Sequence, residues 1–227
     1  MEVSEAIYTF YIGKLALDLK PEAIIQLVVV LLIGVLAWWS TKDLKQRPEG
    51  KKQVVVEFIY TTLKKLVDAN MGEKYEDVVP FIGTLAAFIL PMNLLGLIGI
   101  APTTKNYSVA LTLGLISFVA IQAYAIKKVG VGHYFLGYGE PMIFMLPLNI
   151  IERVMLPVSL SLRLFGNILA ASFIVELVYE SLDKIAWIAQ IGLPVPLHAY
   201  FDVFDGSIQM VIFVMLTMIN MKVVAEH

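Results

Sequence analysis

One basic residue, Arg163, lies near the middle of a long apolar stretch of this sequence. An arginine placed in hydrocarbon costs from roughly 2.5 to over 10 kcal/mol, depending on how far its side chain reaches toward water. Guanidinium cannot avoid this cost by losing its proton, because its pKa lies above about 12. We therefore expect Arg163 to face a partner carboxylate or a water-filled cavity.

More polar residues gather in the same region, on what the pattern predicts to be the last two membrane helices. They are Glu152, Arg153, Asn167, Ser172, Glu176, Asp202, Asp205, Gln209 and Asn220. Polar side chains at membrane depth are functional candidates by default. Ser159, Gly166 and Ala170, close to Arg163, are small enough to let another helix approach.

The composition indicates the class of protein that must position these groups. Of the 227 residues, 59% are hydrophobic and 16% are charged, and the mean hydropathy is +0.79. A soluble domain has about 45–50% apolar and about 25% charged residues. A membrane helix needs about 20 apolar residues, and several such runs are present. We predict an all-α polytopic membrane protein.

Nucleic-acid and metal-binding classes find no support in the sequence. The net charge is −2 and no Lys/Arg-rich tract stands out, so no nucleic-acid partner is expected. The chain lacks cysteine and its three histidines are scattered, so we expect no metal site, cofactor or thiol nucleophile.

We predict five membrane-embedded helices and one amphipathic helix in the membrane interface, in a single membrane domain over 1–227. Its parts are an extracytoplasmic segment (1–21), a first span (22–41), a cytoplasmic loop with the surface helix (42–77), a helical hairpin (78–128) and a final helix pair (141–222). The surface helix rests on the periodicity of residues 54–68, which is also typical of a soluble helix packed on another domain.

The basic residues predict the orientation. Residues 42–77 contain eight Lys/Arg, whereas the turn after the next span has only Lys105. Basic loops stay in the cytoplasm, so we expect the N-terminus outside and the C-terminus inside. Locally, Asn106 or Ser108 is expected to cap a helix, Pro147 and Pro157 to bend or restart one, and the last helix to run over 199–222.

The stretch from Ser159 to Asn167, Ser-Leu-Ser-Leu-Arg-Leu-Phe-Gly-Asn, resembles the signature of the a subunit, the stator channel subunit of F-type ATP synthases. Residues 102–106, 147–152 and 208–217 resemble the same family, in the expected order. The resemblance implies a non-catalytic, ion-translocating subunit of a hetero-oligomeric complex in a bacterial-type cytoplasmic membrane. Its partners would be the lipid bilayer, a b-subunit peripheral stalk and a ring of c subunits, with the last two helices long and tilted across that ring.

The resemblance also assigns roles. Arg163 aligns with the essential arginine of the family, which would hold an arriving c-subunit carboxylate ionised and separate an inlet from an outlet half-channel. Asn167 shares its face, and Gln209 matches a glutamine placed to hydrogen-bond the arginine. A locked ion pair within this chain, and ordinary interhelical hydrogen bonds of the two amides, are the alternatives.

In the outer half-channel the sequence departs from the family pattern. Ser172 stands where many members have a titratable group, and Glu176 lies one turn further, within about 40° of the same face. Asp202 stands where some relatives have histidine. We expect Glu176, Asp202 and Asp205 to line the inlet path, although Glu176 fits the outer interface equally.

His198 is expected at the interface, and a place in a relay along the inlet path is the alternative. Glu152 could line the outlet path or serve as a solvated anchor beside Arg153, and the transported ion is H⁺ or Na⁺. A secondary transporter that uses Arg163 to bind an anionic substrate is the alternative function.

Overall fold

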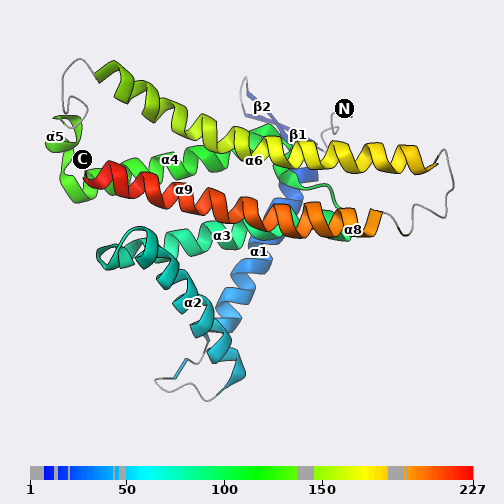
Figure 1. Ribbon diagram of the computed structural model, residues 1–227, viewed down its shortest axis with the longest axis horizontal. Helices are drawn as coiled ribbons and strands as arrows, with labels where there is room; N and C mark the ends of the chain where they lie inside the picture. Colours follow the sequence, from blue (N-terminus) through cyan, green and yellow to red (C-terminus); the bar gives the residue numbers. More distant parts are fainter. Residues whose placement is uncertain are drawn as a thin grey trace. The chain divides into compact units, whose positions relative to one another are not determined.

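The computed structural model of the chain describes residues 8–12, 15–19, 21–42, 44–45, 50–136, 146–183, 192 and 194–226. The helices and strands are β1 (Tyr8–Ile12), β2 (Leu15–Leu19), α1 (Pro21–Thr41), α2 (Lys51–Asn70), α3 (Val79–Leu94), α4 (Tyr107–Val129), α5 (Val131–Leu136), α6 (Leu146–Asp183), α8 (Pro194–His198) and α9 (Gly206–Glu226) (Figure 1). Three short 3₁₀ helices are η1 (Glu73–Val78), η2 (Leu95–Ile98) and η3 (Thr103–Lys105), and η6 (Ala199–Asp205) is a π-helix.

Five helical segments are long and apolar enough to cross a membrane. They are Ala23–Thr41, Glu73–Ile98, Tyr107–Val129, Leu146–Asp183 and Val195–Glu226. The predicted polytopic helical membrane protein is thereby confirmed. The start of the predicted final pair, at 141–145, and residues 184–191 of the predicted outer loop lie outside the described residues.

The chain divides into two compact units, Met1–Thr61 and Thr62–His227. The first contains a hairpin that the helical prediction did not include, in which β1 pairs antiparallel with β2 and Tyr8 lies opposite Leu19. At the end of α1 the Nζ of Lys42 lies 5.3 Å from the ring centroid of Trp38, and the Nζ of Lys52 lies 4.5 Å from that of Trp39. Tryptophan beside lysine is typical of the membrane–water boundary.

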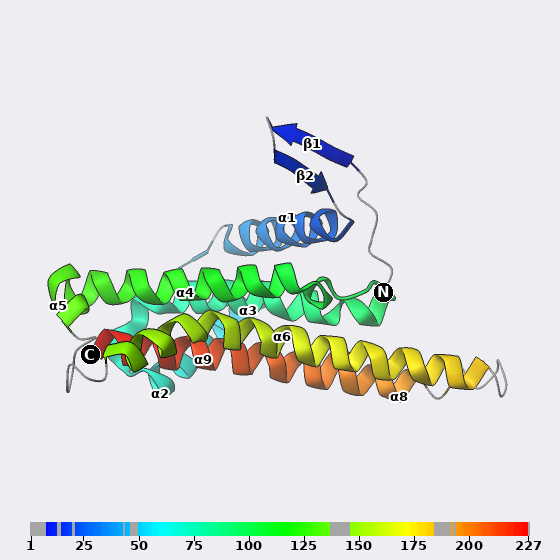
Figure 2. The same cartoon turned by 90° about the horizontal axis from the view of Figure 1, so that it is seen from above.

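In the second unit α3, α4, α6 and α9 run lengthwise beside one another (Figures 1 and 2). α4 packs against both α6 and α9, and α3 packs against α9. The helices bury mainly aliphatic and aromatic side chains in this core, among them Ile82, Ile89, Ile121, Leu164, Phe213 and Met218. α9 also packs against α6, so it contacts all three of the other long helices.

The start of α4 and its contact with α6 follow from particular residues. The side chain of Asn106 accepts a hydrogen bond from the Ser108 amide, so the predicted cap is confirmed. A Cβ added at Gly114 would lie 2.7 Å from the Pro157 carbonyl oxygen, so α4 can approach α6 this closely only without a side chain there. α6 continues as one helix through Pro157 instead of restarting.

A buried polar cluster joins α3 and η3 to the start of α9. Asn93 Nδ2 donates to the Gly206 carbonyl oxygen at 3.0 Å, and Asn93 Oδ1 accepts from the Thr104 hydroxyl at 3.2 Å. Asn93 and Thr104 are 1% and 0% exposed. Because buried polar groups are costly when unpaired, these bonds hold the first turn of α9 on α3.

The other end of α9 is attached through a second polar cluster. The Tyr75 hydroxyl donates to Glu226 Oε1 at 3.1 Å, and Lys74 Nζ lies 3.0 Å from the same oxygen. The Lys128 ammonium lies 3.4 Å from the Tyr75 ring centroid. The cluster therefore connects the end of α9 to η1 and to the end of α4.

Candidate functional site

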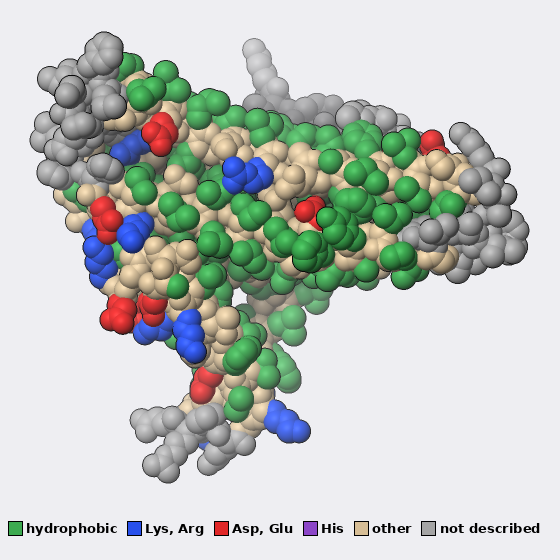
Figure 3. Space-filling view, viewed as in Figure 1, with side chains coloured by type: hydrophobic (Ala, Val, Ile, Leu, Met, Phe, Trp, Pro, Cys, Tyr) green, Lys and Arg blue, Asp and Glu red, His purple; other side chains and the backbone are tan. Residues whose placement is uncertain are grey.

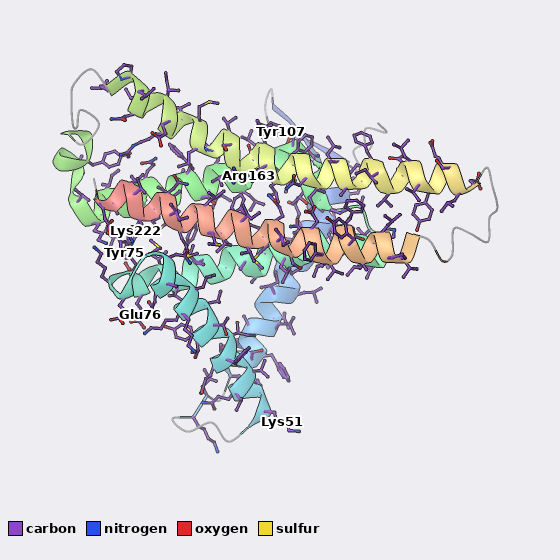
Figure 4. All side chains as sticks on the ribbon, viewed as in Figure 1. Lys51, Tyr75, Glu76, Tyr107, Arg163 and Lys222 are labelled. Atoms are coloured by element: carbon purple, nitrogen blue, oxygen red, sulfur yellow. The ribbon has the colours of Figure 1, made fainter. Side chains whose placement is uncertain are left out.

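Arg163 lies on the exposed face of α6 (Figure 4). The opposite face of that helix is buried at three- and four-residue intervals, by Pro157, Leu160, Ser161, Leu164, Ile168 and Ala171. Ser159, Asn167 and Ala170 are exposed with Arg163. Since positions three and four apart share a helix face, one side of α6 presents a cation among small or polar side chains.

No acid of the described chain neutralises Arg163. Its guanidinium makes no ion pair or hydrogen bond with any residue that the structure describes, so a locked internal ion pair is not found there. Hydrophobic side chains cover the visible face over α6 and α9, with few charged groups among them (Figure 3). The charge is thus exposed on a span whose surface is mostly apolar away from the small and polar residues beside it.

Asn167 and Gln209 join α6 to α9. Asn167 Nδ2 donates to Gln209 Oε1 at 2.6 Å. Gln209 is 1% exposed, and its Nε2 has no hydrogen-bond partner within the described part of the chain. The glutamine expected to bond the arginine thus bonds the amide one turn along the same face, and its own donor stays available in the protein interior.

The last span starts earlier than residue 199, and its beginning is wound differently from an α-helix. After α8, residues Ala199–Asp205 form the π-helix η6, which contains Asp202 and Asp205, and α9 follows at Gly206. π-Helical turns are rare in proteins, and those that occur often lie at functional sites. Periodicity analysis assumes 3.6 residues per turn, so it could not identify this segment.

Asp202 has partners from two other elements. Its Oδ2 lies 2.7 Å from His198 Nδ1, and the His198 Nε2 lies 3.3 Å from the Tyr179 hydroxyl oxygen on α6. A Cβ added at Gly96 of η2 would lie 2.7 Å from the carboxylate of Asp202. His198 is therefore the residue that links Asp202 to α6.

The other residues predicted to line the inlet path make no side-chain hydrogen bond or ion pair with Asp202 or His198 among the described residues. The Ser172 hydroxyl donates back to the Ile168 carbonyl at 2.8 Å. Glu176 is exposed and pairs with no described residue, whereas Tyr179, one turn on, reaches His198. Asp205 is half-buried in η6.

At the other half of α6, Glu152 and Arg153 point to different surroundings. Glu152 is exposed, while Arg153 Nη1 donates to Gln122 Oε1 at 3.3 Å and its guanidinium carbon lies 5.1 Å from the Tyr134 ring centroid. Glu152 precedes Arg163 by eleven residues, which places the two within about 20° of one face.

Sequence reasoning missed three residues that shape this site, Gly96, Tyr179 and Asn93. For Asn93, an amide within an apolar run was the available signal. Its bond to Gly206 fixes the junction between η6 and α9. The site thus contains the exposed cation of Arg163, an amide pair of which only Gln209 is buried, and a histidine and two acids along the last span.

Comparison with known proteins identifies the family. Residues 23–222 match the family model described as ATP synthase A chain. The chain is 32% identical over 210 residues to "ATP synthase subunit a, sodium ion specific" of Propionigenium modestum, covering 86% of this chain and 70% of that protein. It is 34% identical over 222 residues to ATP synthase subunit a of Lysinibacillus sphaericus, covering 92% and 93% of the two chains.

A third relative matches over the full length. ATP synthase subunit a of Staphylococcus carnosus is 31% identical over 243 aligned positions, covering 100% of both chains. Together with the family model, which spans most of the sequence, these matches confirm the expected family. This chain belongs to the ATP synthase A chain family, the a subunits of F-type ATP synthases.

Proposed function

We propose that this chain is the stator subunit that passes H⁺ or Na⁺ to and from carboxyl groups on a ring of c subunits. Two half-channels would reach the ring from opposite sides of the membrane, so that ion flow down its gradient turns the ring and drives ATP synthesis. Membership in the ATP synthase A chain family supports this assignment. The chain would conduct ions without catalysing a reaction.

The exposure of Arg163 without an acid partner among the described residues carries the proposal. A guanidinium on a membrane span is stable only if something outside the chain compensates it. A carboxylate at ~4 Å would be attracted by about 4 kcal/mol at an effective dielectric near 20. A potential of 100 mV supplies roughly 2.3 kcal/mol per charge, so a wet and transient contact lets the ring move on.

Arg163 would also keep the two half-channels apart. Its charge is permanent, so a proton cannot cross by being taken up and released on this side chain. Gln209 and Asn167 would hold the guanidinium ready once a carboxylate arrives, and their hydrogen bond keeps the two amides beside the level of Arg163. The small exposed side chains of α6 would let the ring approach.

The acids along the two long spans would form the paths. Glu176, Asp202 and Asp205, with Ser172 beside them, would line the inlet. Glu152 would line the outlet, which its exposure and its position on the face of Arg163 support.

The remaining parts of the proposal concern the assembly. The chain would sit in a bacterial cytoplasmic membrane with the N-terminus outside and the C-terminus in the cytoplasm, as the basic residues predict. It would contact the c ring through the exposed side of α6 and the b-subunit stalk elsewhere.

The test replaces Arg163 in the assembled ATP synthase. We expect Arg163→Ala to abolish ATP synthesis and ATP-driven ion pumping in membrane vesicles while the complex still assembles. Arg163→Lys should also fail, because lysine can release its proton. Arg153→Lys is the matched control, since Arg153 is held by Gln122 and Tyr134 within this chain, and it should stay coupled.

Retained ion-coupled synthesis in Arg163→Ala would refute the proposal. Uptake of an anionic solute by the purified chain, lost in the same variant, would instead favour a secondary transporter.

A further inference from the structure

A hollow of about 350 Å³ lies where the end of α1 meets the start of α2, within the first compact unit. Its polar wall is formed by Lys42, Lys45, Lys52, Ser40, Gly50 and Gln53. None of the described residues that line it is acidic. In the sequence, residues 40–53 contain five Lys/Arg and two Asp/Glu, so this segment has a net charge of +3. The hollow therefore attracts anions.

Gln53 fixes the shape of the wall. Its Nε2 donates to the Lys45 carbonyl oxygen at 2.6 Å, and its Oε1 accepts from the Lys45 amide at 3.2 Å. The same Nε2 also donates to Glu57 Oε1 at 2.7 Å, one turn along α2. Because both backbone groups of Lys45 are bonded to one side chain of α2, the end of the connecting loop is held against that helix before any ligand arrives.

Two tryptophans at the end of α1 position the lysines. Lys52 Nζ lies 4.5 Å from the Trp39 ring centroid and donates to the Lys42 carbonyl oxygen at 3.5 Å. Lys42 Nζ lies 5.3 Å from the Trp38 ring centroid. An aromatic face attracts an ammonium group without neutralising it. Since neither lysine forms an ion pair with an acid in the described ranges, both charges remain for a ligand.

Beside the hollow, α1 exposes an apolar surface. The side chains of Leu31, Leu32, Val35 and Leu36 are 56–59% exposed in the structure. Tryptophan and lysine at the end of such a span are typical of the level at which lipid headgroups lie. A ligand that fits both features has an anionic group for the lysines and hydrocarbon for α1.

We propose that this hollow binds the headgroup phosphate of an anionic phospholipid, whose acyl chains lie along α1. Phosphate oxygens accept strong, charge-assisted hydrogen bonds from ammonium groups. The first N–H groups of α2 lack partners within their own helix and add donors at the same end. A zwitterionic headgroup would bring its own cation to three lysines, which like-charge repulsion disfavours. The site contains none of the residues assigned to ion translocation.

The test uses the complete ATP synthase in phosphatidylcholine vesicles that contain a small fraction of phosphatidylglycerol with a photoreactive group on an acyl chain. After irradiation, mass spectrometry of the peptides locates and quantifies the label on this chain. We expect the label on the last turns of α1. Excess unlabelled phosphatidylglycerol should displace it, whereas the same amount of added phosphatidylcholine, or inorganic phosphate in the buffer, should not.

Lys52→Gln and Lys51→Gln form a matched pair of variants. Each removes one charge from the first turn of α2, but Lys52 lines the hollow, whereas Lys51 is exposed at the start of the helix and does not line it (Figure 4). Diffuse attraction to anionic lipid accounts for about fivefold per basic residue, so Lys51→Gln should lower the label by no more than this. Lys52→Gln should lower it by about tenfold or more, because a hydrogen bond to a charged group is lost as well. Lys52→Arg keeps the charge and the donors and should retain the label.

A second perturbation leaves the lysines in place. Ser40→Asp adds a carboxylate to the wall of the hollow and should also lower the label. ATP-driven ion pumping by Lys52→Gln and Ser40→Asp in the same vesicles should be retained, which verifies that both variants fold and assemble.

Three results would overturn the lipid site. Equal losses of label in Lys51→Gln and Lys52→Gln would leave diffuse attraction alone. Displacement by inorganic phosphate would make the ligand a free anion. Label confined to a different subunit would mean that a protein covers the hollow. None of these results involves Arg163, so the stator function would stand or fail separately.

Discussion

Asn93 is the residue whose replacement tests the packing of the last span most directly. Asn93→Ala removes the donor to the Gly206 carbonyl and the acceptor for Thr104, both within 3.2 Å in the present structure. Leaving buried partners unpaired costs about 1–3 kcal/mol each in soluble proteins. Between membrane helices the measured cost is smaller, on average about 0.6 and at most about 1.7 kcal/mol per bond.

The cost measured between membrane helices applies here, because the Asn93 cluster lies between two spans. The two bonds together therefore predict a loss of about 1–3 kcal/mol. For a chain of this size each kcal/mol lowers the melting temperature by about 2–4 °C, so a shift of several degrees is expected. Heating the detergent-solubilised complex and following release of this subunit measures it.

Thr104→Val provides a graded control for Asn93→Ala. Thr104→Val keeps the shape and removes one of the two bonds, so it should cost about half as much. The double variant should cost no more than Asn93→Ala, because the shared bond is lost once. If Thr104→Val were as harmful as Asn93→Ala, or if both were neutral, the account of this cluster would be wrong.

Two further predictions concern the contacts of α6. Gly114→Ala places a Cβ 2.7 Å from the Pro157 carbonyl and should cost about 1–3 kcal/mol, seen as reduced assembly in membranes, whereas Gly34→Ala, with nothing within 4 Å, should assemble normally. Asn167→Ala breaks the bond to Gln209 and should lower both heat stability and ATP synthesis. Asn220→Ala is its control, because within the described part of the chain that amide bonds only the Leu216 carbonyl of its own helix; equal effects of the two would contradict the interhelical role of Asn167.

The long apolar helices were predictable because hydropathy and length are local properties of the sequence. The cap at Asn106 was predictable for the same reason, since a capping side chain bonds its own neighbours. The hairpin of β1 and β2 was not, because short segments carry a weak signal beside a membrane span. Arg163 and the residues near it were identified by a specific sequence motif, and helical periodicity did not contribute.

What could not be predicted depends on residues far apart in the chain. Asn93 and Gly206 are 113 positions apart, and Tyr179 and His198 are 19 apart, across residues that give no local pattern. The family resemblance implied the arginine as the partner of Gln209, whereas in the structure Gln209 accepts from the amide of Asn167. The π-winding of η6 also shifts the register of the acids relative to any α-helical projection.

The unbroken length of α6 has a consequence for how the membrane is crossed. Its 38 residues extend about 57 Å, nearly twice the roughly 30 Å of a hydrocarbon core, so the helix must lean steeply or project beyond both surfaces. Glu152, Arg163 and Glu176 are then fixed on a single rigid rod, at intervals of about 16 and 20 Å. The spacing of these three charges along the helix axis is thus set by helix rise and stays constant whatever the connecting loops do.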